Sequence, residues 1–215
     1  MPKVNTPKPS ARDRLLAAAD ELFYREGVQT VGIDRIIERA GVAKASLYNI
    51  FGSKDELVRA YLESRHASTS ERIDRTLTRF RTPRERLLGV FDAQGELFCE
   101  PGFNGCAFTT ASAEAPHGSS AEAAADLYRS WVRTLFMDLA REAGVVDYEA
   151  LARQLHLLYD GAGLSARMDR DPSAATTARA AAALLFDAAP KDDDAADQER
   201  TAPTASSSLP APARA

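Results

Sequence analysis

The chain has 215 residues, of which 45% are hydrophobic and 27% are charged, and its formal net charge at pH 7 is −4. This size predicts one or two globular domains with a buried core, and no run of about 18 consecutive apolar residues indicates a membrane span. The two cysteines, Cys99 and Cys106, are too few for the disulfide framework of a small secreted protein. The first ten residues are polar and lack the apolar core of a signal peptide, so we expect a cytoplasmic protein.

Charge is distributed unevenly along the chain. Residues 1–65 contain 11 basic and 9 acidic side chains, whereas the remainder carries a net charge of −6. Binding to the phosphates of DNA requires basic side chains. The distribution therefore permits DNA contact at the N-terminal end, while the negative total argues against indiscriminate coating of nucleic acid.

Helical spacing of apolar residues begins close to the N-terminus. Ser10 and Asp13 form a weaker variant of a capping box before an apolar stripe that Gly27 ends. A second, shorter stripe over residues 33–40 is followed by Gly41, a residue suited to the left-handed conformation that ends helices. Two helices are therefore predicted before residue 41.

Two further helices follow this glycine. A short helix is predicted over residues 43–50, and Gly52 ends it. Ser53 and Glu56 then form a capping box for a longer helix that extends toward Phe80.

Longer helices are predicted in the second half of the chain, which makes the expected fold class all-α. Capping residues, prolines and glycines divide it into helices at about residues 83–99, 106–114, 119–143, 148–168 and 172–188. From Pro190 the composition changes to Asp, Ala, Ser, Thr and Pro, which predicts a disordered tail over residues 190–215. A helical peptide that folds on a partner is the alternative for this tail.

The short helices around Gly41 form a helix-turn-helix unit over about residues 33–52. A rotation of about 100° per residue places Leu47, Ile50 and Phe51 on the core side of the third helix. The opposite side is centred on small or polar residues, with Lys44 at its margin: Ala45, Ser46, Tyr48 and Asn49. Asn can pair with adenine, Lys with guanine or a phosphate, and Ala or Ser can approach a thymine methyl group. An ordinary solvated helix face fits these polar residues equally well.

A longer pattern of residues at fixed spacing runs through this region. Its members are Leu15, Leu16, Ala17, Ala18, Ala19, Glu21, Leu22, Phe23, Gly27, Ile33, Ile36, Glu38, Arg39, Ala40, Gly41, Val42, Lys44, Leu47, Tyr48, Phe51, Ser53, Lys54, Leu57 and Val58. Over residues 10–70 this pattern resembles the DNA-binding domain of the TetR/AcrR family. The resemblance implies a sequence-specific transcriptional regulator.

The resemblance also implies roles for individual residues. Residues 44–49 match the recognition helix, Tyr48 and Lys54 match positions that contact DNA phosphates, and Thr30 matches a backbone contact. The sequence departs from the common family pattern at Ala45-Ser46 and at Ile50, so the operator sequence does not transfer.

The family organisation implies a division of the chain into four parts. We expect a flexible arm over residues 1–9, a DNA-binding domain over 10–70, a ligand-binding and dimerisation domain over 71–189, and the tail. A homodimer is expected through about residues 148–188, where small residues allow close helix packing: Ala178, Ala181, Ala182 and Leu185. Packing of this alanine-rich helix within its own chain is the alternative.

The same resemblance implies a cavity for a small-molecule effector, expected to be largely apolar, that releases a repressor from a palindromic operator. Candidate wall residues, each of which also fits a plain hydrophobic core, are Phe91, Phe98, Phe103, Phe108, Trp131, Phe136, His156 and Tyr159.

Other classes of function have weaker support. The histidines His66, His117 and His156 do not have metal-ligand spacing, and no phosphate-binding loop or nucleophile elbow is present, so we expect no enzyme, cofactor or metal site. Cys99 and Cys106 flank a turn, but no basic neighbour indicates an activated thiol, which favours buried, reduced cysteines over a redox switch. A helical adaptor that binds protein through its helix-turn-helix remains open; it would lack the steep salt dependence of DNA binding.

Overall fold

The structure is a computed structural model that describes residues 9–192. Within this range the chain is all-α, as predicted, and its only β pairing is a single bridge between Val145 and Lys191. The nine helices of the described range are α1 (Ala11–Glu26), α2 (Ile33–Ala40), α3 (Lys44–Phe51), α4 (Lys54–Leu77), α5 (Pro83–Phe98), α6 (Ala107–Glu114), α7 (Ser120–Glu142), α8 (Tyr148–Asp169) and α9 (Ala174–Ala188). Of the predicted arm (residues 1–9) and the predicted tail (residues 190–215), residues 1–8 and 193–215 lie outside the described residues. Residues 190–192, which were predicted as the start of the tail, pair instead with residues 144–146 through backbone hydrogen bonds and the single bridge.

Side-chain caps fix several of the predicted helix starts. Ser10 Oγ accepts a hydrogen bond from the Asp13 N–H at 3.2 Å, and the Asp13 carboxylate accepts one from the Ser10 N–H at 3.1 Å. The same reciprocal arrangement begins α5, where Thr82 and Glu85 flank Pro83 in the first turn. Such boxes satisfy backbone donors that a helix start otherwise leaves unpaired.

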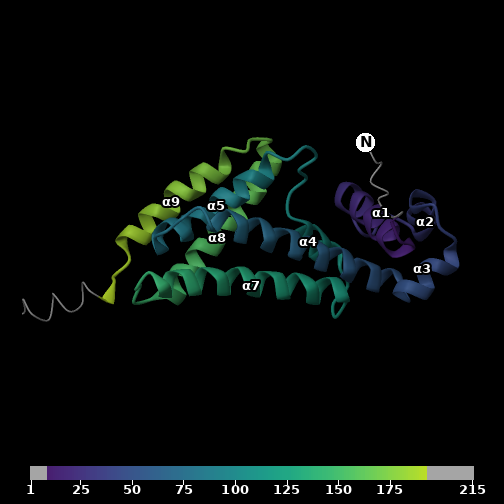
Figure 1. Cartoon of the computed structure of the whole chain (residues 1–215), viewed down its shortest axis with the longest axis horizontal. Helices are drawn as coiled ribbons and strands as arrows, with labels where there is room; N and C mark the ends of the chain where they lie inside the picture. The colour runs from purple at the N-terminus through teal and green to yellow at the C-terminus, as the bar shows by residue number, and fades with distance from the viewer. Residues whose placement is uncertain (1–8, 193–215) are drawn as a thin grey trace, which may run out of the picture.

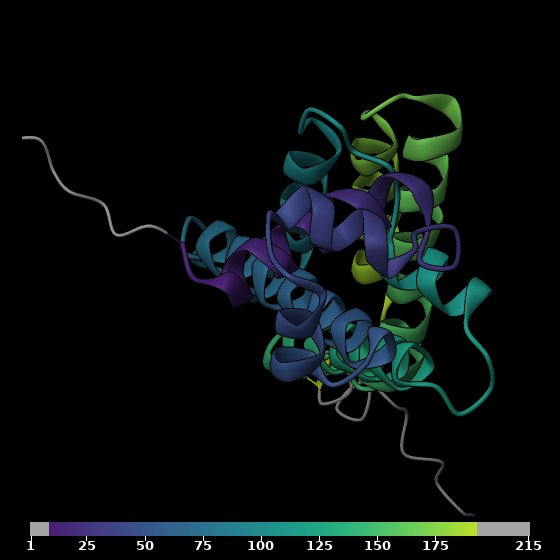
Figure 2. The same ribbon diagram turned by 90° about the vertical axis from the view of Figure 1, so that its right-hand side faces the viewer.

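Helices α1–α3 gather at one end of an elongated molecule, and α4 extends from them into the body (Figure 1). In the body α4 packs against α5 and α7, and α8 packs between α7 and α9. In a view turned by 90°, along the long axis of the molecule, α1–α3 lie in front of the remaining helices (Figure 2). The domain boundary expected near residue 70 falls inside α4, which is helical from Lys54 to Leu77.

One connected hydrophobic core joins the two ends of the molecule. Leu15, Leu47 and Tyr61 are fully or almost fully buried near α1–α3, and Phe91 and Phe136 are fully buried in the body. Because α4 contributes buried residues near both of its ends, it connects the packing of α1–α3 to that of the body.

Candidate nucleic-acid interface and effector cavity

The recognition helix predicted from the sequence is α3, and a tight turn places it. Gly41 adopts a left-handed conformation with φ of 61°, which allows its N–H to reach the carbonyl of Glu38 at 3.1 Å. The N–H of Val42 reaches the carbonyl of Ile37 at 3.2 Å. Leu47 has no exposed surface and anchors α3 to the helices that it packs against, α1, α2 and α4.

The outer face of α3 carries the residues that the sequence placed there. Ala45, Tyr48 and Asn49 are exposed, and Ser46 is half-buried. Within residues 9–192, neither the Tyr48 hydroxyl nor the Asn49 amide makes a hydrogen bond. This face is therefore a row of small and polar groups with free hydrogen-bonding capacity.

Ile50 does not lie on the core side of α3, which corrects the sequence prediction. Its exposed fraction is 37%, whereas Leu47 is fully buried and Phe51 is half-buried beneath the Arg12 guanidinium, 5.6 Å from the ring centroid. At about 100° per residue, Ile50 lies about 60° from Leu47 on the side away from Phe51. The body covers only the narrow strip that contains Leu47 and Phe51, so Ile50 joins the outer face.

The three other predicted DNA contacts lie around α3. Lys44 Nζ is 3.0 Å from Asp34 Oδ1, in an ion pair that is largely exposed. Thr30 is exposed in the connection before α2. Lys54 is half-buried with its Nζ 5.9 Å from the centroid of the Phe23 ring; burial lowers the pKa of Lys54, and the Glu114 carboxylate opposes this effect.

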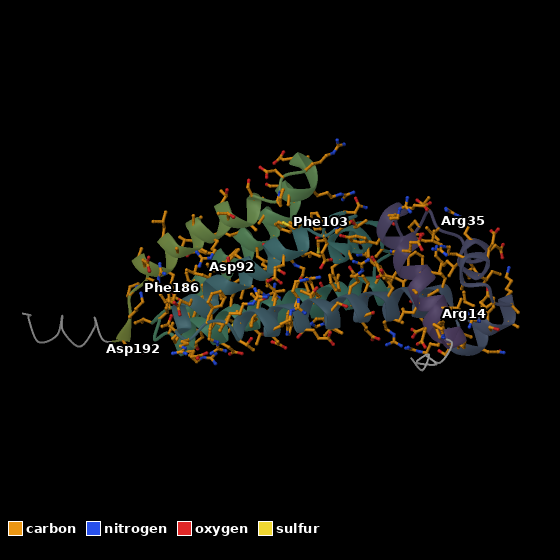
Figure 3. The ribbon with its side chains drawn as sticks, turned by 45° about the horizontal axis from the view of Figure 1, so that its top comes forward. Arg14, Arg35, Asp92, Phe103, Phe186 and Asp192 are labelled. Carbon is orange, nitrogen blue, oxygen red and sulfur yellow. The ribbon has the colours of Figure 1, made fainter. Side chains whose placement is uncertain are left out.

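A cavity of about 560 Å³ lies in the body where α1, α4, α5, α7 and α8 meet. Of the candidate wall residues, Phe98, Phe103, Phe108 and Tyr159 line it. Phe103 lies toward the α1–α3 end of the body, and Phe186 lies at the opposite end (Figure 3).

The other four candidate wall residues belong to the packed interior instead. Phe91 and Phe136 are fully buried with ring centroids 5.7 Å apart. Trp131 packs against His66 with ring centroids 4.7 Å apart, and His156 is buried on α8. These four residues have the same aromatic character as the four that line the cavity. Which candidates line the cavity is decided by how the helices cross, and the sequence does not show that.

The polar part of the wall was not predicted from the sequence. Along α4 the cavity is lined by polar residues on one side of the helix: Ser64, Arg65, Ser68, Thr69 and Arg72. Residues one, three and four positions apart lie on one side of a helix. The sequence therefore contained a signal for this polar side of α4. The wall is therefore mixed in character rather than largely apolar.

Tyrosine hydroxyls and one amide supply neutral hydrogen-bonding groups to the cavity. The hydroxyls of Tyr128 and Tyr159 lie 3.3 Å apart. Burial raises the pKa of Tyr159 to about 12 and that of Tyr128 well above its ordinary value, so both remain neutral at physiological pH. Gln94 Nε2 donates to the Tyr159 carbonyl at 2.7 Å, whereas the buried Gln94 Oε1 has no partner in the part of the chain that the structure describes.

Helix α1 forms part of the cavity wall through Asp20 and Tyr24. The Tyr24 hydroxyl donates to the Gly105 carbonyl at 2.9 Å and accepts from the Asn104 N–H at 2.9 Å. Arg65 of α4 makes two hydrogen bonds to the Asp20 carboxylate, at 2.5 and 2.8 Å, and stacks 3.8 Å from the centroid of the Tyr24 ring. A molecule in the cavity would therefore touch the helix that supports α3.

Both cysteines are free thiols. Cys106 is half-buried and lines the cavity, whereas Cys99 is exposed, which corrects the expectation that both are buried.

His156 is a buried histidine outside the cavity wall. Its Nε2 is 3.6 Å from the Asp160 carboxylate. Desolvation lowers the pKa of His156 below its usual value of 6.5, and the Asp160 charge opposes that shift. The folded state therefore binds fewer protons than the unfolded state, and stability is lost as the pH falls below 6.5.

We expect a His156→Gln variant to lose less thermal stability than wild type on acidification. Melting temperatures measured at about pH 7.5 and about pH 5.5 bracket the ordinary histidine pKa. His117→Gln is the matched control because the His117 side chain is fully exposed. Equal acid sensitivity of wild type and His156→Gln would contradict this assignment.

Residues 9–192 contain neither a cluster of metal-ligating side chains nor a membrane-spanning helix. No group of three or more His, Cys, Asp or Glu side chains is placed to hold a metal ion. Among the described helices, none is long and apolar enough to cross a bilayer.

The fold and the α3 face define the class of protein. A tightly turned pair of short helices, backed by a longer helix and joined to a helical body, is the architecture of helix-turn-helix regulators. The sequence profile described as "Bacterial regulatory proteins, tetR family" matches residues 15–61. A crystal structure of a TetR-family transcriptional regulator from Streptomyces coelicolor is 31% identical, with a TM-score of 0.76 over 82% of this chain and 94% of that chain.

Curated relatives match less than half of the chain. The transcriptional activator FasR of Mycolicibacterium smegmatis is 36% identical over 87 residues, which are 40% of this chain and 40% of FasR. The transcriptional repressor NemR of Escherichia coli is 30% identical over 105 residues, which are 48% of this chain and 53% of NemR. The chain thus spans about half or less of the curated relatives it matches. Together with the structural match over 82% of this chain, these findings show that the chain belongs to the TetR family, a non-enzymatic family of transcriptional regulators.

Proposed function

We propose that this protein is a dimeric, effector-responsive repressor that binds a palindromic operator through α3. The observation that carries the proposal is the unpartnered Tyr48 and Asn49 side chains on the exposed face of a helix that Leu47 anchors. Family membership supports a DNA-binding role for this face. We propose that residues 10–70 bind DNA and that residues 71–189 bind the partner subunit and supply most of the effector site, to which α1 and α4 also contribute.

The residues of α3 have distinct proposed roles in the major groove. Asn49 reads a base edge, Ala45 and Ser46 allow close approach, and Tyr48 donates to a phosphate. Lys44 can leave Asp34 for DNA at small cost, because an exposed ion pair contributes little.

Two residues outside α3 complete the proposed interface. Thr30 and Lys54 contact the sugar-phosphate backbone on either side of the recognition helix. Such contacts fix the register of the protein on DNA without reading sequence.

The proposed dimer forms through α8 and α9. Large apolar side chains are exposed there along one face of α8 and on α9: Leu157 at 72%, Leu164 at 58%, Met168 at 72% and Leu184 at 73%. Ala178 and Ala182 are buried against their own chain, so these two members of the expected small-residue stripe pack within the subunit. A second copy covering the leucine-rich face would place two recognition helices on one operator.

The cavity is the proposed effector site. An effector there would contact α1 through Tyr24 and Asp20 and α4 through Arg65, and these helices carry α3. Release from the operator requires only that the effector binds better to a conformation in which the recognition helices are misspaced.

We expect Tyr48→Ala and Asn49→Ala variants to remain folded and each to lose ~1–3 kcal/mol of operator affinity. Operator fragments selected from random DNA by the wild-type protein provide the substrate for gel-shift titration. Leu127→Ala is the control, because Leu127 is exposed on α7, outside both α3 and the proposed dimer helices. Unchanged binding by both α3 variants would remove this helix from the interface.

A further inference from the structure

The effector cavity carries an excess of positive charge. Four arginines and three carboxylates line it. Each carboxylate accepts a hydrogen bond from one arginine: Asp20 from Arg65 at 2.5 Å, Glu100 from Arg72 at 2.7 Å and Asp160 from Arg129 at 2.8 Å. Arg167 on α8 makes no ion pair with any residue between 9 and 192. One positive charge of the wall is therefore uncompensated.

Arg72 provides further unused donors. Its side chain is only 14% exposed, and its bond to Glu100 uses one of the five N–H groups of a guanidinium. Within the described range, Gln94 Oε1 is the one side-chain nitrogen or oxygen atom that is both fully covered and without a hydrogen-bond partner. The nitrogens of Arg72 that make no hydrogen bond are therefore not fully covered by the protein. Since Arg72 lines the cavity, we infer that these donors can bond to a molecule inside it.

Gln94 adds an acceptor on the same wall. The residue is 6% exposed, and the bond from its Nε2 to the Tyr159 carbonyl fixes the amide. The unpartnered Oε1 is costly, because a buried acceptor loses its bond to water. This oxygen is fully covered, so a ligand N–H or O–H group removes the cost only if the atoms that cover Oε1 shift aside.

Aromatic rings complete the wall. Phe98 and Phe103 lie with ring centroids 4.9 Å apart, and Phe108 stacks on Tyr128 with centroids 3.8 Å apart. All four line a cavity of about 560 Å³, a volume typical of sites for small organic molecules. The apolar part of a ligand would lie against these rings.

We propose that the effector is an aromatic organic monoanion whose charge is balanced by Arg167 and Arg72 and whose hydrogen-bond donor reaches Gln94. This inference rests on the proposed role of the cavity as the effector site. Arg167 is exposed, so its unpaired charge costs little without a ligand. The preference for an anion comes instead from its attraction to Arg167 and from charge-assisted hydrogen bonds with the remaining donors of the largely buried Arg72.

A matched pair of fluorescent probes tests the charge preference. Anilinonaphthalene sulfonate is an aromatic monoanion with one N–H donor, and phenylnaphthylamine is its neutral counterpart without the sulfonate. Both are titrated into a Cys99→Ser protein, in which the remaining thiol, Cys106, reports occupancy because it lines the cavity. We expect the sulfonate to bind about tenfold more tightly than the neutral probe and to slow alkylation of Cys106.

Arginine variants test whether Arg167 and Arg72 cause the preference for the sulfonate probe. We expect Arg167→Gln and Arg72→Gln each to reduce the preference for the sulfonate. Arg75→Gln is the control, because Arg75 lies on α4 close to Arg72 but does not line the cavity. Equal binding of the two probes to the Cys99→Ser protein, no protection of Cys106, or a preference that survives both cavity variants would overturn the inference.

Operator binding by the same preparations separates this inference from the proposed function. If the selected DNA binds normally while the two probes bind equally, the charge assignment is wrong and the regulator assignment stands. If the sulfonate binds selectively but no DNA is retained, the proposed regulator function is wrong while the anion preference of the cavity stands.

Discussion

A protein with the double substitution Leu157→Glu and Leu184→Glu should be a monomer and should lose operator affinity by about a hundredfold or more. Both leucines are more than 70% exposed on helices that pack against each other, so the substitutions disturb little within the subunit. Two carboxylates on each copy would place like charges in the proposed apolar interface, and each monomer would engage only one half of a palindrome. Leu164 is kept unchanged because it also lines the cavity.

Sedimentation velocity and gel-shift titration measure these two effects. The matched control is Leu127→Glu, since Leu127 is 69% exposed on α7 and lies outside α8 and α9. Wild type and the control should sediment as dimers at micromolar concentration. A double variant that remains dimeric, or a control that dissociates to the same extent, would show that the dimer uses another surface.

The second large effect is expected for Leu47→Ala, which should destabilise the N-terminal helices by ~2–5 kcal/mol. Leu47 is fully buried and is the only fully buried residue within α3. Without it, α3 loses its attachment to the body, and operator binding should be lost together with stability.

Ile50→Ala is the internal control for this experiment. Ile50 lies on the same helix but is 37% exposed, so its truncation should change the free energy of unfolding by less than about 0.5 kcal/mol. Urea unfolding followed by circular dichroism, with amide hydrogen exchange in α3, measures both variants. Equal destabilisation by the two substitutions would contradict the separation of core and outer face in α3.

Local signals predicted the fold and the outer face of α3. Ser10, Gly41 and Ser53 mark helix ends through bonds to residues within a few positions, which a sequence displays directly. Ala45 and Asn49 share a face by helical rotation alone. The error at Ile50 arose because periodicity gives a direction on the helix but not the width of the strip that the body covers.

The cavity was predicted less well because it depends on helix crossings. Phe98 lines it and Phe91 does not, although both are aromatic residues of α5 separated by two helical turns. Tyr24 and Asp20 reach it from a helix assigned to DNA binding, which no local pattern in the sequence indicated. The polar stripe of α4 from Ser64 to Arg72 was readable, but its interpretation required knowing that α4 faces a hollow.

The sharing of α1 between the cavity and the support of α3 has a consequence for changing the specificity of this regulator as a biosensor. Substitution of Tyr24 or Asp20 to accept a new inducer would also disturb the bonds to Asn104, Gly105 and Arg65, and would shift the uninduced baseline. Variation at Tyr128 and Tyr159, on the adjoining parts of the wall formed by α7 and α8, avoids that coupling. Libraries confined to those walls should alter inducer choice while leaving basal promoter occupancy intact.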